Sequence, residues 1–312
     1  MMTGCFQKQG VWAVLTVTLA AGAICGAAER AAFEAALVLG DGVDAPGPLR
    51  IVLLADKKDH GPSGNGLHDY PLWQERWALL LGGRAASDDA EQVNLHGPAI
   101  TDAALEEGAP GVSVERASGW PTDGQFAAAD VIVAFCYLPW NDARKKQVDA
   151  YLARGGGLVA IHSATWTRPK ADPAVAELLG VGGFTRYRHG EVRMELAAPD
   201  HPVCRNLPRM IVLDDETYWP PTPPFDAECV TVLAVCREKN EGGEQQPQPM
   251  LWTFAPGKGR VFGCVPGHRA ATFDDPWFRL AVLRGIAWAA GGSPYRFDRL
   301  APRGERFDGP VK

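Results

Sequence analysis

The chain has 312 residues, and its 31 Lys and Arg against 37 Asp and Glu give a net charge of −6 at pH 7. This acidic balance argues against nucleic acid and against an anionic membrane surface as the main partner. The seven cysteines include no CxxC pair and are widely spaced, which fits neither a structural zinc site nor a disulfide framework.

Residues 1–28 have the pattern of a secretory signal peptide. Lys8 is the only charged residue among them, an apolar run covers residues 11–24, and the small residues at 26–28 offer a cleavage site. The apolar run is shorter than the roughly 20 residues of a membrane span. We therefore expect a periplasmic or extracellular protein with no membrane span after signal removal, and a retained N-terminal anchor is the alternative.

Residues 29–48 are rich in Ala, Gly and Pro without a period, which predicts a linker. The domain predicted over residues 49–293 opens with alternating strands and helices. Apolar runs predict strands at 50–56, 112–116, 129–136 and 158–162, and helical spacing predicts helices at 72–81, 142–154 and 174–179. This alternation predicts an α/β fold with a doubly wound, mainly parallel sheet.

The second half of the domain is richer in strands. They are predicted at 191–196, 210–213, 230–236, 250–254 and 260–265, with a closing helix at 277–290. The turn at 255–259 predicts a hairpin between the last two strands. A polar loop is expected at 242–249, and the charged segment 294–312 is expected to lie on the surface as a C-terminal tail.

Histidines follow two of the buried strands directly. His162 ends the run LVAIH, and His268 follows FGCVPG. Ligands of open parallel sheets bind just beyond the carboxyl ends of the strands. A histidine at this place can act as an acid, a base or a metal ligand. The alternative is a structural histidine that is bonded to a neighbouring backbone group.

Three acids, Asp214, Asp215 and Glu216, follow another predicted strand. If that strand continues, Asp214 and Glu216 share one face and Asp215 points to the other. A carboxylate beside a histidine can bind a metal, transfer a proton or orient the histidine. A solvated turn or a salt bridge is the alternative, and the sequence leaves both the presence and the identity of a divalent metal open.

Two further histidines, His60 and His68, flank a glycine-rich loop. The loop suits a substrate or metal site, with a solvated loop as the alternative, and it lacks the GxxxxGK[ST] pattern of a phosphate site. Trp166 lies on a loop, where its ring can stack on a sugar or anchor the fold. Ser163 lacks the Gly-x-Ser-x-Gly elbow and Cys136 is followed by Tyr-Leu-Pro, so we predict neither as a nucleophile.

Five short motifs in order along the chain resemble the ThuA-like (trehalose-utilisation) family. They are GGGLVAIHSATW at 155–166, ELLGVGGF at 177–184, DHPVCRNLP at 200–208, DDETYW at 214–219, and the long stretch from PMLWTFAPGKG to GIAWAAG at 249–291. The resemblance extends over nearly all of the chain after residue 49.

The resemblance implies a flavodoxin-like core related to class I glutamine amidotransferases, and a role in carbohydrate catabolism, often in exported proteins. The amidotransferase cysteine is replaced here by His162-Ser163, so amidotransferase activity is expected to be absent. The recurring motif positions that the resemblance implies are His162, His201, Asp215, Glu216, Tyr218 and His268.

Together these observations predict an enzyme that acts on a sugar or keto-sugar derivative. We predict His162, Glu216 and His268 as catalytic residues. The predicted substrate-binding residues are Trp166, Tyr218, Asp215, His60 and His68. The expected partner is a small molecule or glycan, and the sequence does not determine the oligomeric state. The alternative is a non-catalytic module that binds sugars or another protein.

Overall fold

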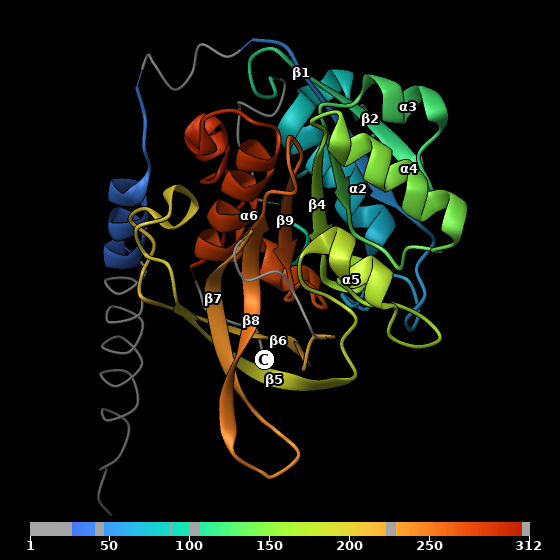
Figure 1. The fold of residues 1–312 in the computed structure, drawn as a ribbon. Helices are drawn as coiled ribbons and strands as arrows, with labels where there is room; N and C mark the ends of the chain where they lie inside the picture. The colour runs from blue at the N-terminus through green and yellow to red at the C-terminus, as the bar shows by residue number, and fades with distance from the viewer. Residues whose placement is uncertain (1–26, 41–46, 88, 100–106, 223–228, 308–312) are drawn as a thin grey trace, which may run out of the picture.

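The structure is a computed structural model that describes residues 27–40, 47–87, 89–99, 107–222 and 229–307 (Figure 1). The predicted signal peptide lies outside the described residues except for its last two positions. Within the described ranges, no helix is both long enough and apolar enough to cross a membrane.

Nine strands of the described residues form one sheet, in the order β2-β1-β3-β4-β9-β8-β7-β5-β6. The pairs from β2 to β9 are parallel, and the pairs from β9 to β6 are antiparallel. This confirms the predicted doubly wound parallel core with added strands in the second half. The strands span Leu49–Ala55 (β1), Val112–Ser118 (β2), Val131–Ala134 (β3), Gly157–Ile161 (β4), Arg186–Leu196 (β5), Met210–Trp219 (β6), Val230–Lys239 (β7), Gln245–Phe254 (β8) and Arg260–Cys264 (β9).

Helices cover both faces of the parallel strands. On one face, Trp73 of α2 and Phe278 of α6 both contact the ring of Phe273. On the other face, Phe126 of α3 contacts Tyr151 of α4. The helices span Tyr70–Gly82 (α2), Asp123–Ala128 (α3), Asp142–Ala153 (α4), Pro173–Leu179 (α5) and Pro276–Ala289 (α6).

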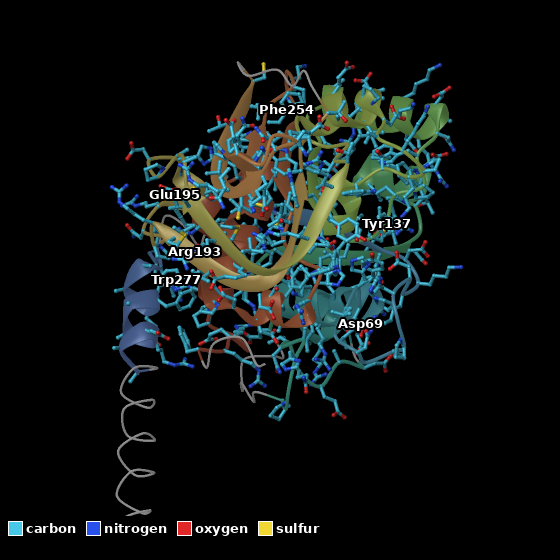
Figure 2. The ribbon with its side chains drawn as sticks, turned by 90° about the horizontal axis from the view of Figure 1, so that it is seen from below. Asp69, Tyr137, Arg193, Glu195, Phe254 and Trp277 are labelled. Carbon is cyan, nitrogen blue, oxygen red and sulfur yellow. The ribbon has the colours of Figure 1, made fainter. Side chains whose placement is uncertain are left out.

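The antiparallel strands are longer than their apolar runs predict. β6 continues through the acidic run to Trp219, because each of its residues pairs with β5 along an unbroken ladder. β8 begins at Gln245, so most of the expected polar loop at 242–249 is strand, paired with β7. In Figure 1, β5 and β6 pass below the lower ends of the parallel strands. Figure 2 shows β5 curving across this face of the molecule.

The segments at the two ends of the described chain are more ordered than their composition indicates. Residues 27–36, which include the start of the linker expected at 29–48, are helical, and the fully buried Phe33 contacts Trp277. The C-terminal segment Pro294–Leu300 is a 3-10 helix that buries Phe297, instead of lying only on the surface. Each of these two segments is held by one buried aromatic side chain, Phe33 or Phe297. One such residue gives no periodic apolar pattern, so the sequence did not reveal this packing.

A buried ion pair fastens both end segments to α6. Arg284 and Asp298 are fully buried, with a 2.7 Å contact between guanidinium and carboxylate. Asp298 also accepts the backbone N–H of Val38, at 2.8 Å. Arg284 donates to the carbonyl of Ala36, at 3.2 Å.

We expect Arg284→Met to lower the free energy of unfolding by roughly 3–5 kcal/mol, because it leaves the Asp298 carboxylate buried without its counter-ion. Urea unfolding followed by circular dichroism measures the change. The exposed Lys146→Met on α4 serves as the control and should change stability little. A loss below about 1 kcal/mol for Arg284→Met would show that the pair does not hold these segments.

Candidate functional site

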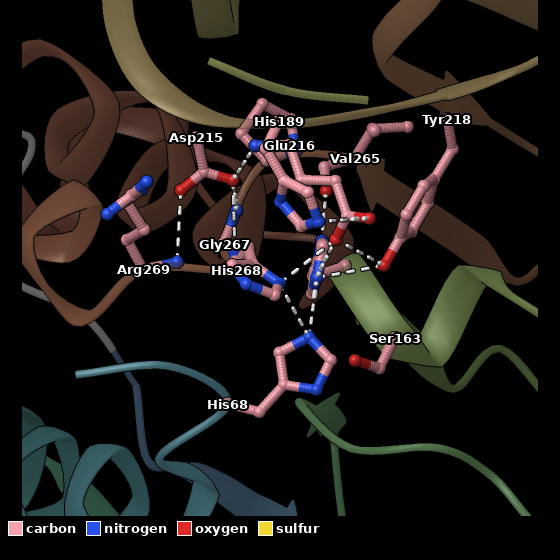
Figure 3. Close-up of polar contacts among 12 residues, drawn as sticks. His68, Ser163, His189, Asp215, Glu216, Tyr218, Val265, Gly267, His268 and Arg269 are labelled. Carbon is pink, nitrogen blue, oxygen red and sulfur yellow. Dashed lines mark hydrogen bonds and ion pairs between the residues drawn. The ribbon is translucent and has the colours of Figure 1, made fainter. Parts of the chain in front are cut away.

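Four buried polar side chains from four separate segments meet at the carboxyl ends of the parallel strands. His68, His162, Glu216 and His268 each offer one nitrogen or oxygen atom, and these atoms all lie within 4.8 Å of one another (Figure 3). We call this group the His/Glu cluster. Each of its side chains is at most 6% exposed. The structure therefore brings together all three residues predicted as catalytic, and adds His68 from the glycine-rich loop.

His162 occupies a strained turn directly after β4. Its backbone φ is +50°, in the left-handed region that non-glycine residues rarely adopt. Its Nδ1 lies 2.7 Å from the carbonyl oxygen of Val265, which follows the neighbouring strand β9. A Cβ on Gly267 would lie 3.1 Å from the Cβ of His162, so this close approach favours glycine. The sequence around Ser163 lacks the Gly-x-Ser-x-Gly motif of a nucleophile elbow, but the backbone still makes a strained turn at this place. His162 occupies the corner of that turn.

His68 reaches the cluster from the loop after β1. It also has a positive φ, of +45°. Its Nδ1 lies 2.9 Å from the carboxylate of Asp59 and 2.9 Å from the hydroxyl of Tyr70. Its backbone N–H donates to the carbonyl of His268, at 3.0 Å, and a β-bridge joins the next residue pair, Leu67 and Arg269. These backbone contacts hold the C-terminal end of the glycine-rich loop against the segment that carries His268.

Strand β6 supplies Glu216 to the cluster and places Tyr218 beside it. Both side chains lie on one face of β6, and the Tyr218 hydroxyl lies 2.8 Å from Nε2 of His162 and 3.3 Å from Glu216. Asp215 points to the opposite face, as the alternation predicted. It accepts the backbone N–H groups of Gly267 and His268 at 2.9 and 3.0 Å. Asp215, predicted to bind substrate, is fully buried and instead holds the chain segment that carries His268.

The environment fixes the charges of the cluster. Burial by itself raises the pKa of Glu216, but its close contacts with the imidazoles of His162 and His268 outweigh it and hold this pKa well below its usual range. Burial is the main cause that lowers the pKa of His68 to about 4, against the opposing hydrogen bond with Asp59. Burial also raises the pKa of Tyr218 well above 10. At neutral pH the site therefore combines a carboxylate, a neutral His68 and a protonated tyrosine.

A more exposed ring of side chains surrounds the cluster. Trp166 packs against Tyr218 at 4.8 Å between ring centroids, and the exposed Tyr187 lies 6.2 Å from Trp166. The ring centroid of His60 lies 5.2 Å from that of His68 and 5.3 Å from that of His268. The predicted residues Trp166 and His60 thus lie at the rim of the site, beside the cluster.

His189 is the site residue that the sequence did not reveal. Its side chain is 45% exposed, and its Nε2 lies 3.8 Å from Glu216. The pairing of β5 with β6 places it directly opposite Glu216. Because the predicted strand began at residue 191, His189 fell outside it. The run RYRHGE is polar apart from Tyr187 and shows no apolar alternation, so no local pattern would have included it in the strand.

The remaining candidates lie outside the cluster. Ser163 is buried and its hydroxyl is 2.7 Å from the hydroxyl of Tyr70. Burial raises the pKa of the Cys136 thiol far above its usual range, which disfavours a nucleophilic thiolate. His201 caps a short 3-10 helix and its ring lies 6.0 Å from Trp288, away from the site.

Comparisons with known proteins agree with this architecture. A ThuA-like protein from Bacteroides uniformis has a TM-score of 0.55 and 20% identity, with 80% of this chain and 97% of that chain covered. A ThuA-like protein from Parabacteroides merdae has a TM-score of 0.51 and 19% identity, covering 79% of this chain and 91% of that one. At this identity the two likenesses establish the fold alone. None of the curated protein sequences matched the chain.

The sequence model of the ThuA family, described as trehalose utilisation, matches residues 77–289. This range holds three members of the His/Glu cluster, and the fourth, His68, precedes it. Because the match extends over more than half of the chain, the protein belongs to the ThuA family.

Proposed function

We propose that the protein is an enzyme of carbohydrate catabolism that acts on a sugar or keto-sugar derivative through histidine and carboxylate acid–base chemistry. The observation that carries the proposal is the His/Glu cluster itself. Three histidines and a glutamate, drawn from segments up to 200 residues apart, meet where open parallel sheets bind their ligands. Membership of a family described as trehalose utilisation indicates the substrate class.

His162 and His268 are the groups of the cluster suited to proton transfer with sugar hydroxyl or carbonyl groups. Glu216 stays ionised and contacts both of them, and the Tyr218 hydroxyl keeps its proton and can donate a hydrogen bond. Proton transfer by such positioned groups accelerates reactions by roughly 10²–10⁴-fold. The aromatic rings of Trp166 and Tyr187 at the rim offer faces on which a sugar ring can stack.

Backbone strain indicates that the two histidines at the centre of the site have a functional role. His68 and His162 both hold a positive φ, a conformation that costs about 1–3 kcal/mol per residue and persists where the surroundings enforce it. Both strained residues aim their rings at the same point, where they contact each other at 3.0 Å. Such strain concentrates at active sites and ligand clamps.

The proposal excludes glutamine amidotransferase activity. The corner of the turn after β4 carries His162, and the next residue is the buried Ser163. The thiols of Cys136 and Cys264 are buried, and burial raises the pKa of each. A covalent thioester step needs an ionised and accessible thiol.

The proposal includes export, which rests on the signal pattern of residues 1–28. We expect a periplasmic or secreted mature protein that begins near residue 29. Fractionation of cells that express the full chain, followed by N-terminal sequencing, measures this. A chain that stays in the cytoplasm with Met1 intact would refute export, and an uncleaved chain in the membrane fraction would indicate the retained anchor.

We expect His162→Ala and His268→Ala each to lower turnover by about 10²-fold or more, because each removes a group that contacts Glu216. The assay incubates the purified protein with disaccharides, including trehalose, and their 3-keto derivatives, and follows the products by NMR. His201→Ala is the matched control, because this histidine lies outside the site. Circular dichroism confirms that each variant keeps its fold.

Full turnover in both variants would refute the proposal. Calorimetry with the same panel of sugars distinguishes the enzyme from the alternative, a non-catalytic module. If the wild-type protein binds a sugar but turns over none of them, it is a sugar-binding module. Ammonia release from glutamine by the wild-type protein would contradict the exclusion of amidotransferase chemistry.

A further inference from the structure

The hydrogen-bond partners of two histidines fix the tautomers in the His/Glu cluster. Nδ1 of His162 lies 2.7 Å from the carbonyl oxygen of Val265, and Nδ1 of His68 lies 2.9 Å from the carboxylate of Asp59. A carbonyl and a carboxylate only accept hydrogen bonds, so both Nδ1 atoms carry the proton. In each neutral imidazole, Nε2 then carries a lone pair. That of His68 faces the centre of the cluster, and that of His162 faces both this centre and the Tyr218 hydroxyl, 2.8 Å away.

These lone pairs face one another at short distance. The two Nε2 atoms of His68 and His162 are 3.0 Å apart, and neither can donate a proton to the other. Nδ1 of His268 lies 2.9 Å from Nε2 of His68 and 3.0 Å from Oε2 of Glu216. A single proton on this Nδ1 can satisfy only one of those contacts. Protonating all three histidines instead would bury three positive charges beside only the two carboxylates of Glu216 and Asp59, at a large desolvation cost.

The four atoms have the dimensions of a metal site. They form a ring with successive separations of 3.0, 3.2, 3.0 and 2.9 Å, from His68 through His162, Glu216 and His268 back to His68. The other two pairs lie across the ring, at no more than 4.8 Å. The centre of a square of that side is about 2.1 Å from each corner, which matches the bonds of a divalent transition metal to imidazole nitrogen and carboxylate oxygen.

The groups that accept hydrogen bonds from the outer nitrogens of these histidines are also of the kind found around metal sites. Histidine ligands of metals donate their second N–H to a carboxylate or a backbone carbonyl, which holds the ring and raises its basicity. Asp59 does so for His68 and the carbonyl of Val265 does so for His162. Asp215 holds the backbone of His268.

From these observations we infer that His68, His162, Glu216 and His268 bind one divalent first-row transition metal ion. Three imidazoles and one carboxylate favour Zn²⁺, Fe²⁺, Mn²⁺, Co²⁺ or Ni²⁺ over Ca²⁺ and Mg²⁺, which prefer all-oxygen sites. The inference deepens the proposed function and uses the same site, although it does not depend on the reaction. A bound ion polarises a sugar oxygen or lowers the pKa of a bound water to about 7.

The test measures metal binding directly on the purified full-length protein. The protein is treated with a chelator, dialysed and titrated separately with Zn²⁺, Mn²⁺, Co²⁺, Ni²⁺ and, without oxygen, Fe²⁺, with calorimetry and elemental analysis as readouts. We expect one ion per chain and a rise in the unfolding temperature on binding. Co²⁺ provides a visible absorption band that reports the ligands.

His68→Ala and Glu216→Gln should each abolish stoichiometric binding or weaken it by more than about 100-fold, since each removes a ligand. His201→Ala should bind as the wild type does, because its imidazole lies outside the cluster. Asp59→Ala keeps all four ligands and removes the carboxylate that accepts from Nδ1 of His68, together with its 3.9 Å contact with Arg168. We expect it to weaken binding by about 10–100-fold, whereas Asp56→Ala, a carboxylate at the start of the same loop, should have no effect.

The inference is overturned if the wild-type protein binds none of these ions, or if His68→Ala and Glu216→Gln bind them as tightly as the wild type. Binding is read without any sugar, so the two proposals fail separately. A protein that holds the ion but turns over no sugar would refute the proposed function and leave the metal site standing.

Discussion

The site depends on the burial of four polar side chains at one point, where each must find hydrogen-bonding partners. Buried polar groups destabilise a fold unless they are paired. Around the His/Glu cluster the partners come from every adjoining element: the carbonyl of Val265 after β9, Asp59 in the loop after β1, and Tyr218 on β6. This requirement fixes the rings in place, and it makes the loop after β1 part of the site.

The parallel strands and the added antiparallel strands contribute differently to the His/Glu cluster. The parallel strands β4 and β9 end side by side, which places His162 next to the segment that carries His268. The added antiparallel strands then cross this edge, and β6 supplies Glu216 from the other side. Asp215 joins the two halves, because its carboxylate accepts backbone N–H groups of the segment after β9. A flavodoxin-like core is thereby closed over its usual ligand edge by its own additional strands.

The chemistry of the site follows from the side chain that the turn after β4 presents. A histidine, His162, occupies the strained corner of this turn. The chemistry available there is therefore that of imidazole and carboxylate groups, which transfer protons and bind transition metals. The half-exposed ring of His189 borders the buried cluster, and the exposed ring of Tyr187 lies beside His189.

By itself the sequence determined the parallel core, the strand ends at His162 and His268, and the opposite directions of Asp215 and Glu216, because apolar runs and strand alternation are local properties. Only the tertiary structure decided that His68 enters the cluster, since this needs the loop after β1 to fold across to β9. The same holds for His189, whose place depends on pairing with β6, and for Asp215, whose partners lie more than 50 residues away. Contacts between distant segments follow from strand order and register, which no local pattern encodes.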